Sequence, residues 1–127
     1  MIQDIEIERE CIRAVEGEQM WVLLNHVKAD RRKEFERFMY ELMMPIAART
    51  EPDVLNRTRI LHPTEPNKDG TYTYIFIMDP VVAEGEYDIG KLLLRVYSPE
   101  QAEEYTKLWN ESLASPQVGY VVTQSAW

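Results

Sequence analysis

The 127-residue chain has one cysteine, two histidines, five glycines and no long apolar run. A lone cysteine, Cys11, excludes an internal disulfide framework and fits a reducing compartment. So few histidine and cysteine side chains, at unrelated spacings, predict no metal site. No stretch approaches the roughly 18–20 apolar residues of a membrane span, and the acidic N-terminus is unlike a signal peptide. We therefore expect a cytoplasmic protein with no cofactor.

Positive charge is also scarce, because 14 Lys and Arg stand against 22 Asp and Glu, for a net charge of −8. This balance disfavours nucleic acid and anionic membranes as partners, since both are negatively charged. Hydrophobic residues make up 45% of the chain, which is enough for a core, and the length suits one domain. We expect an acidic N-terminal arm at 1–19, helical or extended, and a single domain at 20–127.

The pattern of apolar residues predicts four strands and two long helices. Strands are expected at 20–29, 54–61, 71–78 and 118–127, and helices at 31–50 and from Ser98 to before Pro116. Asp69-Gly70 predicts a tight turn before the third strand. A short helix is expected after Asp88.

Several residues mark where the helices should begin, end or bend. Asp30 is the expected N-cap of the first long helix. Ser98 should cap the second, because Pro99 fits the first turn and Gln101 stands where a capping box needs it. Pro45 removes a backbone donor and should kink or tighten the first helix near its end.

The order strand, helix, strand, strand, helix, strand is the split βαβ or ferredoxin-like order of an α+β protein. It predicts a four-stranded antiparallel sheet with both long helices on one face. The strands are apolar on both faces, as in MWVLLNHV at 20–27 and TYTYIFIM at 71–78. Because two helices cover only one face, we expect a homodimer in which a second copy covers the other.

Two stretches resemble a known group of proteins. These are WVLLNHVKADRRKEFERF at 21–38 and SPEQAEEYTKLWNESLASPQVGYVVTQSAW at 98–127. They resemble the dimeric α/β-barrel superfamily, which includes antibiotic-biosynthesis-monooxygenase-like and stress-responsive barrel proteins. The resemblance implies a ferredoxin-like dimeric α/β barrel over residues 20–127. Residues 78–97 form a longer segment than the strand-to-helix link usual in that group.

Asn25 and His26 are the candidate catalytic residues. A buried amide must be hydrogen-bonded, so Asn25 either pairs with a neighbouring strand, through Thr58 or Gln124, or donates to a ligand. The resemblance implies the second role, since some monooxygenases of that group use an asparagine. His26 is either a structural histidine or, if it faces a cavity, a general base or haem ligand.

Candidate ligand-binding residues are the stripe Tyr72, Tyr74 and Phe76 on the third strand, with His62 at the rim of a pocket. Such a stripe is either sheet core or a wall for a flat hydrophobic compound. A pocket, if present, should lie between the sheet and its covering elements, beside the first and third strands. Arg57 and Arg59 should lie on one face of the second strand, where they form a solvated face, make salt bridges across the dimer or bind an anionic group.

Two functions are compatible with these observations. One is a homodimeric α/β-barrel protein of unassigned role that binds a small hydrophobic ligand. The other is a cofactor-independent or haem-linked monooxygenase-like enzyme acting on an aromatic or quinone-type compound in the barrel cavity. The lack of a spaced catalytic signature favours the first, and the resemblance favours the second.

Overall fold

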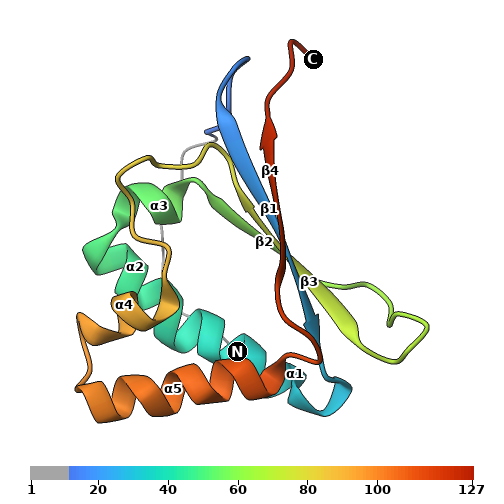
Figure 1. Cartoon of the computed structure of the whole chain (residues 1–127), viewed down its shortest axis with the longest axis vertical. Helices are drawn as coiled ribbons and strands as arrows, with labels where there is room; N and C mark the ends of the chain where they lie inside the picture. The colour runs from blue at the N-terminus through green and yellow to red at the C-terminus, as the bar shows by residue number, and fades with distance from the viewer. Residues whose placement is uncertain (1–11) are drawn as a thin grey trace.

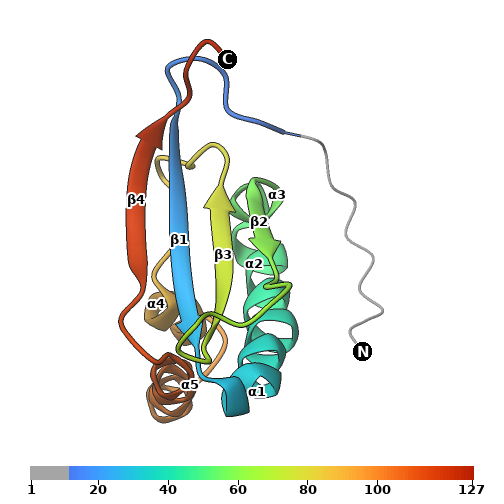
Figure 2. The ribbon, with the colours of Figure 1, turned by 90° about the vertical axis from the view of Figure 1, so that its right-hand side faces the viewer.

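The computed structural model describes residues 12–127, so the expectations for Cys11 and most of the N-terminal arm lie outside the described residues. A four-stranded antiparallel sheet has the order β2-β3-β1-β4. Its strands are β1 (Gln19–Val27), β2 (Thr58–Leu61), β3 (Tyr72–Met78) and β4 (Val118–Thr123). The helices all lie on one side of it (Figures 1 and 2). The ferredoxin-like α+β prediction is therefore confirmed.

The helix expected at 31–50 is divided into segments of different geometry. These are the 3-10 turn η1 (Ala29–Arg31), α1 (Arg32–Arg37), the π-helical η2 (Phe38–Met43) and α2 (Met44–Thr50). The predicted cap at Asp30 is wrong, because Asp30 lies inside η1 and no side chain caps α1. Pro45 does not tighten the helix as expected: a wider π-helical segment ends just before it, and Pro45 lies in the first turn of α2, where its missing N–H is tolerated.

The strand expected at 54–61 is half helix. Pro52 starts α3 (Pro52–Asn56) in the first turn, where its missing N–H leaves no bond unmade. Val54 and Leu55 are buried on that helix, so their burial is achieved without a strand. Only Thr58–Leu61 pairs with β3.

The second half of the chain follows the local signals. Asp88 accepts a hydrogen bond from the Lys91 N–H at 2.8 Å and begins α4 (Ile89–Leu94). Ser98 accepts one from the Gln101 N–H at 3.2 Å and begins α5 (Pro99–Ser112). Both predicted helix starts are confirmed. The turn at Asp69-Gly70 is confirmed as well, with Gly70 at a φ of 87°.

Strand pairing decides which side chains meet the helices. Leu23 lies opposite Phe76 and Asn25 opposite Tyr74, so their common face packs on α1, η2 and α5. Phe35 and Trp109 stack at the centre of this core, with ring centroids 5.2 Å apart. No helix of residues 12–127 is long and apolar enough to cross a membrane.

β4 differs from the other strands because all six of its residues are exposed. Val121 lies on the helix side and is 64% exposed, while Tyr120 lies on the opposite side and is 53% exposed. The helices therefore cover β1 and β3 but leave this edge of the sheet open on both faces.

Candidate functional site

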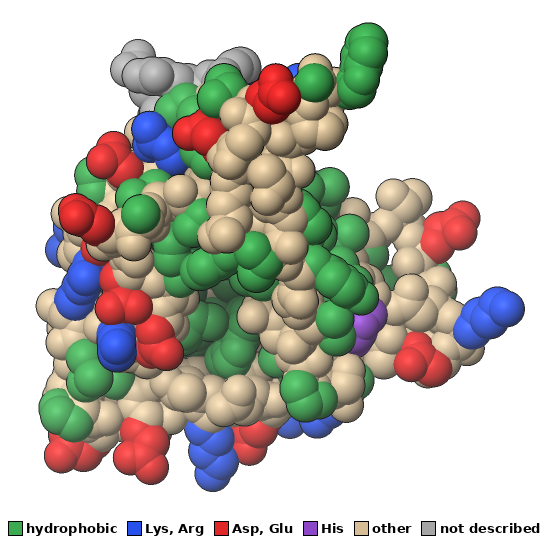
Figure 3. Space-filling view, turned by 45° about the horizontal axis from the view of Figure 1, so that its top comes forward, with side chains coloured by type: hydrophobic (Ala, Val, Ile, Leu, Met, Phe, Trp, Pro, Cys, Tyr) green, Lys and Arg blue, Asp and Glu red, His purple; other side chains and the backbone are tan. Residues whose placement is uncertain are grey.

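A cavity of about 440 Å³ lies between the helix-facing side of the sheet and the helices. It opens to the surface as a hollow walled mainly by hydrophobic side chains (Figure 3). Leu23, Thr58, Ile60, Phe76 and Met78 form its sheet side. The helical side and the connecting segments contribute a larger group: Met39, Met43, Met44, Ala47, Val54, Leu55, Glu86, Tyr87, Asp88, Ile89, Gly90, Leu92, Thr106, Trp109, Asn110 and Gln117.

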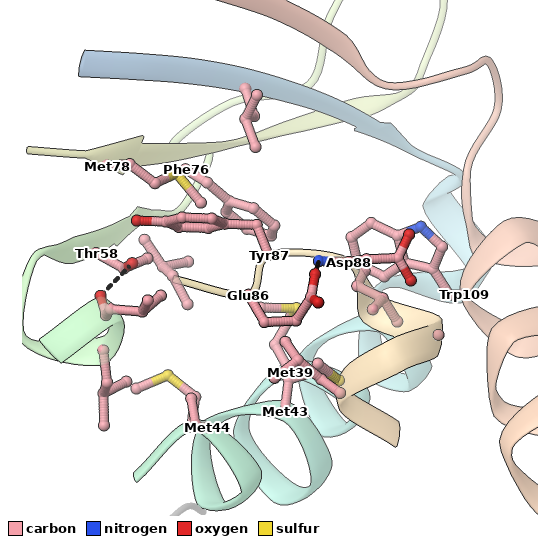
Figure 4. A pocket seen from close by; sticks show the side chains of 18 of the residues that line it. Met39, Met43, Met44, Thr58, Phe76, Met78, Glu86, Tyr87, Asp88 and Trp109 are labelled. Carbon is pink, nitrogen blue, oxygen red and sulfur yellow. Dashed lines mark hydrogen bonds between the residues drawn. The ribbon is translucent and has the colours of Figure 1, made fainter. Parts of the chain in front are cut away.

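Four of the six methionines in the chain line this cavity. The π segment η2 ends in Met43, and the N–H of Met44 donates to the Met39 carbonyl, five residues earlier. Met39, Met43 and Met44, on this wider turn and directly after it, lie on the same wall of the cavity (Figure 4). Methionine side chains are flexible and polarisable, so the wall can adapt to apolar shapes.

The segment between β3 and α4 forms a further side of the cavity. Gly85 packs so closely on α3 that an added Cβ would lie 2.5 Å from Val54 Cγ2. The Tyr87 ring lies 4.8 Å from the Trp21 ring, and its hydroxyl accepts a hydrogen bond from the Val82 N–H at 2.9 Å. Any larger residue at Gly85 would push this segment away from α3.

Asp79 anchors the start of the same segment. Its carboxylate is buried and accepts hydrogen bonds from the Ala14 N–H at 2.6 Å and from Arg59 Nη2 at 2.7 Å. Arg57 lies 3.8 Å from Asp53. Both arginines therefore form salt bridges within the chain, and Arg57 ends α3 and does not share the second strand with Arg59 as expected. Arg59 holds the start of the segment that joins β3 to α4.

Polar groups are few in the lining, and two of them are carboxylates. Glu86 Oε2 accepts a hydrogen bond from the Asp88 N–H at 3.0 Å, and Asp88 caps α4. Burial raises the pKa of Tyr87, and this outweighs the hydrogen bond from the Val82 N–H, which lowers it. The Tyr87 hydroxyl therefore keeps its proton at neutral pH. The cavity thus offers hydrogen-bonding groups within a mainly apolar surface, as ligand sites do.

Asn25 is fully buried beside the cavity but does not line it. Its Nδ2 donates to the Tyr74 carbonyl at 3.3 Å, and its Oδ1 accepts from Gln117 Nε2 at 2.7 Å. These partners are not the predicted Thr58 or Gln124. Gln117 itself lines the cavity, so Asn25 contacts the site only through it.

His26 lies on the opposite face of the sheet, away from the helices. Its Nδ1 lies 2.8 Å from Thr73 Oγ1, and it borders a shallow surface depression with Asp69. No histidine lines the cavity. The two candidate catalytic residues are therefore not brought together on one face.

Of the four predicted ligand-binding residues, Phe76 alone lines the cavity. Tyr74 is buried and donates its hydroxyl proton to Glu36 while accepting from Arg32 Nε at 3.1 Å. The Arg32 guanidinium also lies 4.0 Å from the centre of the Tyr72 ring. Tyr72 and Tyr74 thus belong to a polar cluster at the α1 end of the sheet.

His62 joins that cluster rather than the cavity. Its Nε2 is hydrogen-bonded to the Tyr40 hydroxyl, and its ring lies edge-on to Tyr74. Burial, then the hydrogen bond to Glu36, raises the pKa of Tyr74 to about 12, against the opposing effect of Arg32. Within residues 12–127 no three His, Cys, Asp or Glu side chains gather as a metal site.

Sequence analysis did not identify the methionines, Glu86, Tyr87 or Asp88 as site residues. The signal for the last three was present in the unusual length of the segment at 78–97, which supplies one whole side of the cavity. The methionines carried no comparable signal, because helical spacing of apolar residues predicts core and cavity wall alike.

No protein-family model and no curated protein matches the chain. A structure from Caulobacter crescentus CB15, described as a "putative antibiotic biosynthesis monooxygenase", is 12% identical with a TM-score of 0.46, and the match covers 87% of this chain and 92% of that chain. A structure of the same description from Bordetella bronchiseptica is 14% identical with a TM-score of 0.44, and the match covers 86% of this chain and 98% of that chain. Both descriptions name the antibiotic-biosynthesis-monooxygenase group that the sequence resembles.

The hydrogen bonds of Asn25 predict a structural effect of its replacement. Asn25→Leu should lower the free energy of unfolding by about 1–3 kcal/mol, because the buried Tyr74 carbonyl loses its donor. Gln117→Leu should lower the free energy of unfolding of the wild type, because it leaves the Asn25 oxygen unpaired. In the Asn25→Leu variant the same change should lower it much less, because that oxygen is already absent. Chemical denaturation of the two single variants and the double variant measures this coupling, and strictly additive costs would contradict it.

The Tyr74 cluster predicts a late tyrosine titration. Tyr74 should ionise near pH 12, whereas an ordinary tyrosine ionises near 10.0. Because folding raises this pKa, the stability it contributes is complete below pH 10.0 and is lost as the pH rises towards 12. Subtracting the ultraviolet titration of Tyr74→Phe from that of the wild type isolates the group. A difference curve centred near 10.0 would refute the assignment.

Proposed function

We propose that this protein binds a small, mainly apolar molecule in the cavity between its sheet and helices, and that it acts as a homodimer. The cavity itself carries the proposal. Its volume of about 440 Å³ falls in the range of small-molecule sites, and apolar side chains form most of its wall. An apolar ligand would gain roughly 25 cal/mol for each Å² removed from water.

The proposal is one of binding rather than of catalysis. Asn25 has structural partners for both ends of its amide, and His26 lies on the far face of the sheet. Neither lines the cavity, so the residues predicted to be catalytic cannot act together on a molecule held there. The methionine wall instead favours adaptable recognition of shape.

The homodimer is supported by the bare face of the sheet (Figure 2). Strand alternation places nine apolar side chains there: Met20, Val22, Leu24, Leu61, Ile75, Ile77, Val118, Tyr120 and Val122. A continuous apolar face of this kind is rare on a monomer. A second copy offers a matching surface, since two-fold symmetry places the same patch on both sides of the interface.

The cavity predicts a ligand-binding variant with a matched control. Ala47→Phe places a ring in the cavity and should weaken binding of the neutral fluorescent probe N-phenyl-1-naphthylamine at least about tenfold. Ala48→Phe changes the exposed neighbour on the same helix and should leave binding unchanged. Fluorescence titration measures both. Absence of saturable probe binding by the wild type would overturn the proposal.

The bare face predicts the mass in solution. Sedimentation equilibrium at micromolar concentration should give twice the 15.0 kDa of one chain. Ile75→Glu should give monomers, because burying an unpaired carboxylate at the interface costs several kcal/mol. Ala48→Glu, on the exposed side of α2, serves as the control. A wild-type monomer would contradict the proposed interface.

A further inference from the structure

The charge of the cavity lining has a single sign. Glu86 and Asp88 are its acidic members, and no Lys, Arg or His lines it. Within residues 12–127, every salt bridge involves other acidic residues, so neither of these carboxylates is paired with a basic side chain. A cavity lined in this way attracts positive charge and repels negative charge.

The two charged side chains of the lining are unevenly placed. In Figure 4, Met44, Met78 and Thr58 lie at one end of the cavity and Asp88 and Trp109 at the other. Glu86 lies between the two ends and, with Asp88, belongs to the segment that joins β3 to α4. A bound molecule is therefore offered one uncharged end, and negative charge from the middle of the cavity to the other end.

Trp109 adds a second feature that favours a cation at the charged end. Its side chain lines the cavity and is only 7% exposed. None of the hydrogen bonds among the described residues uses its indole N–H, although that nitrogen is not sealed from solvent. Because water can reach that nitrogen, the N–H needs no acceptor from a ligand. The aromatic ring is what favours a cation, since its face stabilises a nearby positive charge.

From these observations we infer that the ligand is a cationic amphiphile, a ring-sized apolar molecule that carries a protonated amine. The inference rests on the proposed function and names its ligand class. The apolar body lies among the methionines and Phe76, and the amine lies between Glu86 and Asp88 beside Trp109. A ligand with a carboxylate in place of the amine would meet two unpaired negative charges.

A matched set of three ligands tests the charge preference. The amine 1-naphthylmethylamine, the neutral 1-naphthalenemethanol and the anionic 1-naphthoate share one ring system and differ in their polar group. At low ionic strength the amine should bind about three- to tenfold tighter than the alcohol, as expected for partly exposed ion pairs, and the acid should bind most weakly. Calorimetric titration of the full chain measures all three, and added salt should reduce the amine's advantage.

Conservative variants assign the preference to the two carboxylates. Glu86→Gln keeps a hydrogen-bond acceptor for the Asp88 N–H, and Asp88→Asn keeps a residue able to cap α4. Each should remove part of the amine's advantage while affinity for the alcohol stays unchanged. Glu84→Gln removes an exposed carboxylate from the same segment but outside the lining, and should change neither affinity.

The outcomes separate this inference from the function on which it rests. If the alcohol binds as tightly as the amine, the cavity is a ligand site without charge selection and the inference is overturned. The same holds if the amine's advantage survives in both Glu86→Gln and Asp88→Asn. If none of the three compounds binds, and the neutral fluorescent probe also fails, the proposed function is overturned with it.

Discussion

The contact between Gly85 and Val54 sets the position of the segment that joins β3 to α4, and the cavity depends on that position. At its start, Asp79 fixes the segment to Arg59 and to the Ala14 backbone. At its end, Asp88 caps α4, and in between Gly85 lets the backbone approach α3 within side-chain contact distance. The same segment supplies the two carboxylates, so the shape and the charge of the site have one structural origin.

Local signals predicted the elements that depend on neighbouring residues. Ser98 and Asp88 start their helices as expected, because a cap involves amides only a few residues away. The strand expected from residue 54 was wrong in its first half, which is α3, because there the local sequence suits both structures. Val54 and Leu55 are apolar and follow a proline, which suits a buried helical turn as well as a strand, and packing on the core decided between them.

The site was harder to predict than the fold, since its partners are distant in sequence. Asn25 stood out as a polar residue in an apolar strand, but its partner Gln117 is 92 residues away. Only the folded chain shows that the pair is structural and that Trp109 faces the cavity instead. The prediction of a pocket beside the first and third strands was nevertheless close, because Leu23, Phe76 and Met78 lie on the sheet side of the cavity.

The π-helical segment η2 also limits which insertions and deletions the chain can tolerate. It accommodates more residues per turn than an α-helix, and successive α-helical residues are rotated by about 100°. The wide turn already holds one residue more than an α-helical turn, so deleting one residue between Phe38 and Met43 would restore an α-helix and leave the residues that follow close to their present orientation. Inserting one residue after Met43 would instead rotate or shift everything that follows, up to Thr50. Ile46 would then leave the core and Ala47 would leave the cavity wall. This helix can therefore lose one residue from the wide turn more readily than it can gain one in α2.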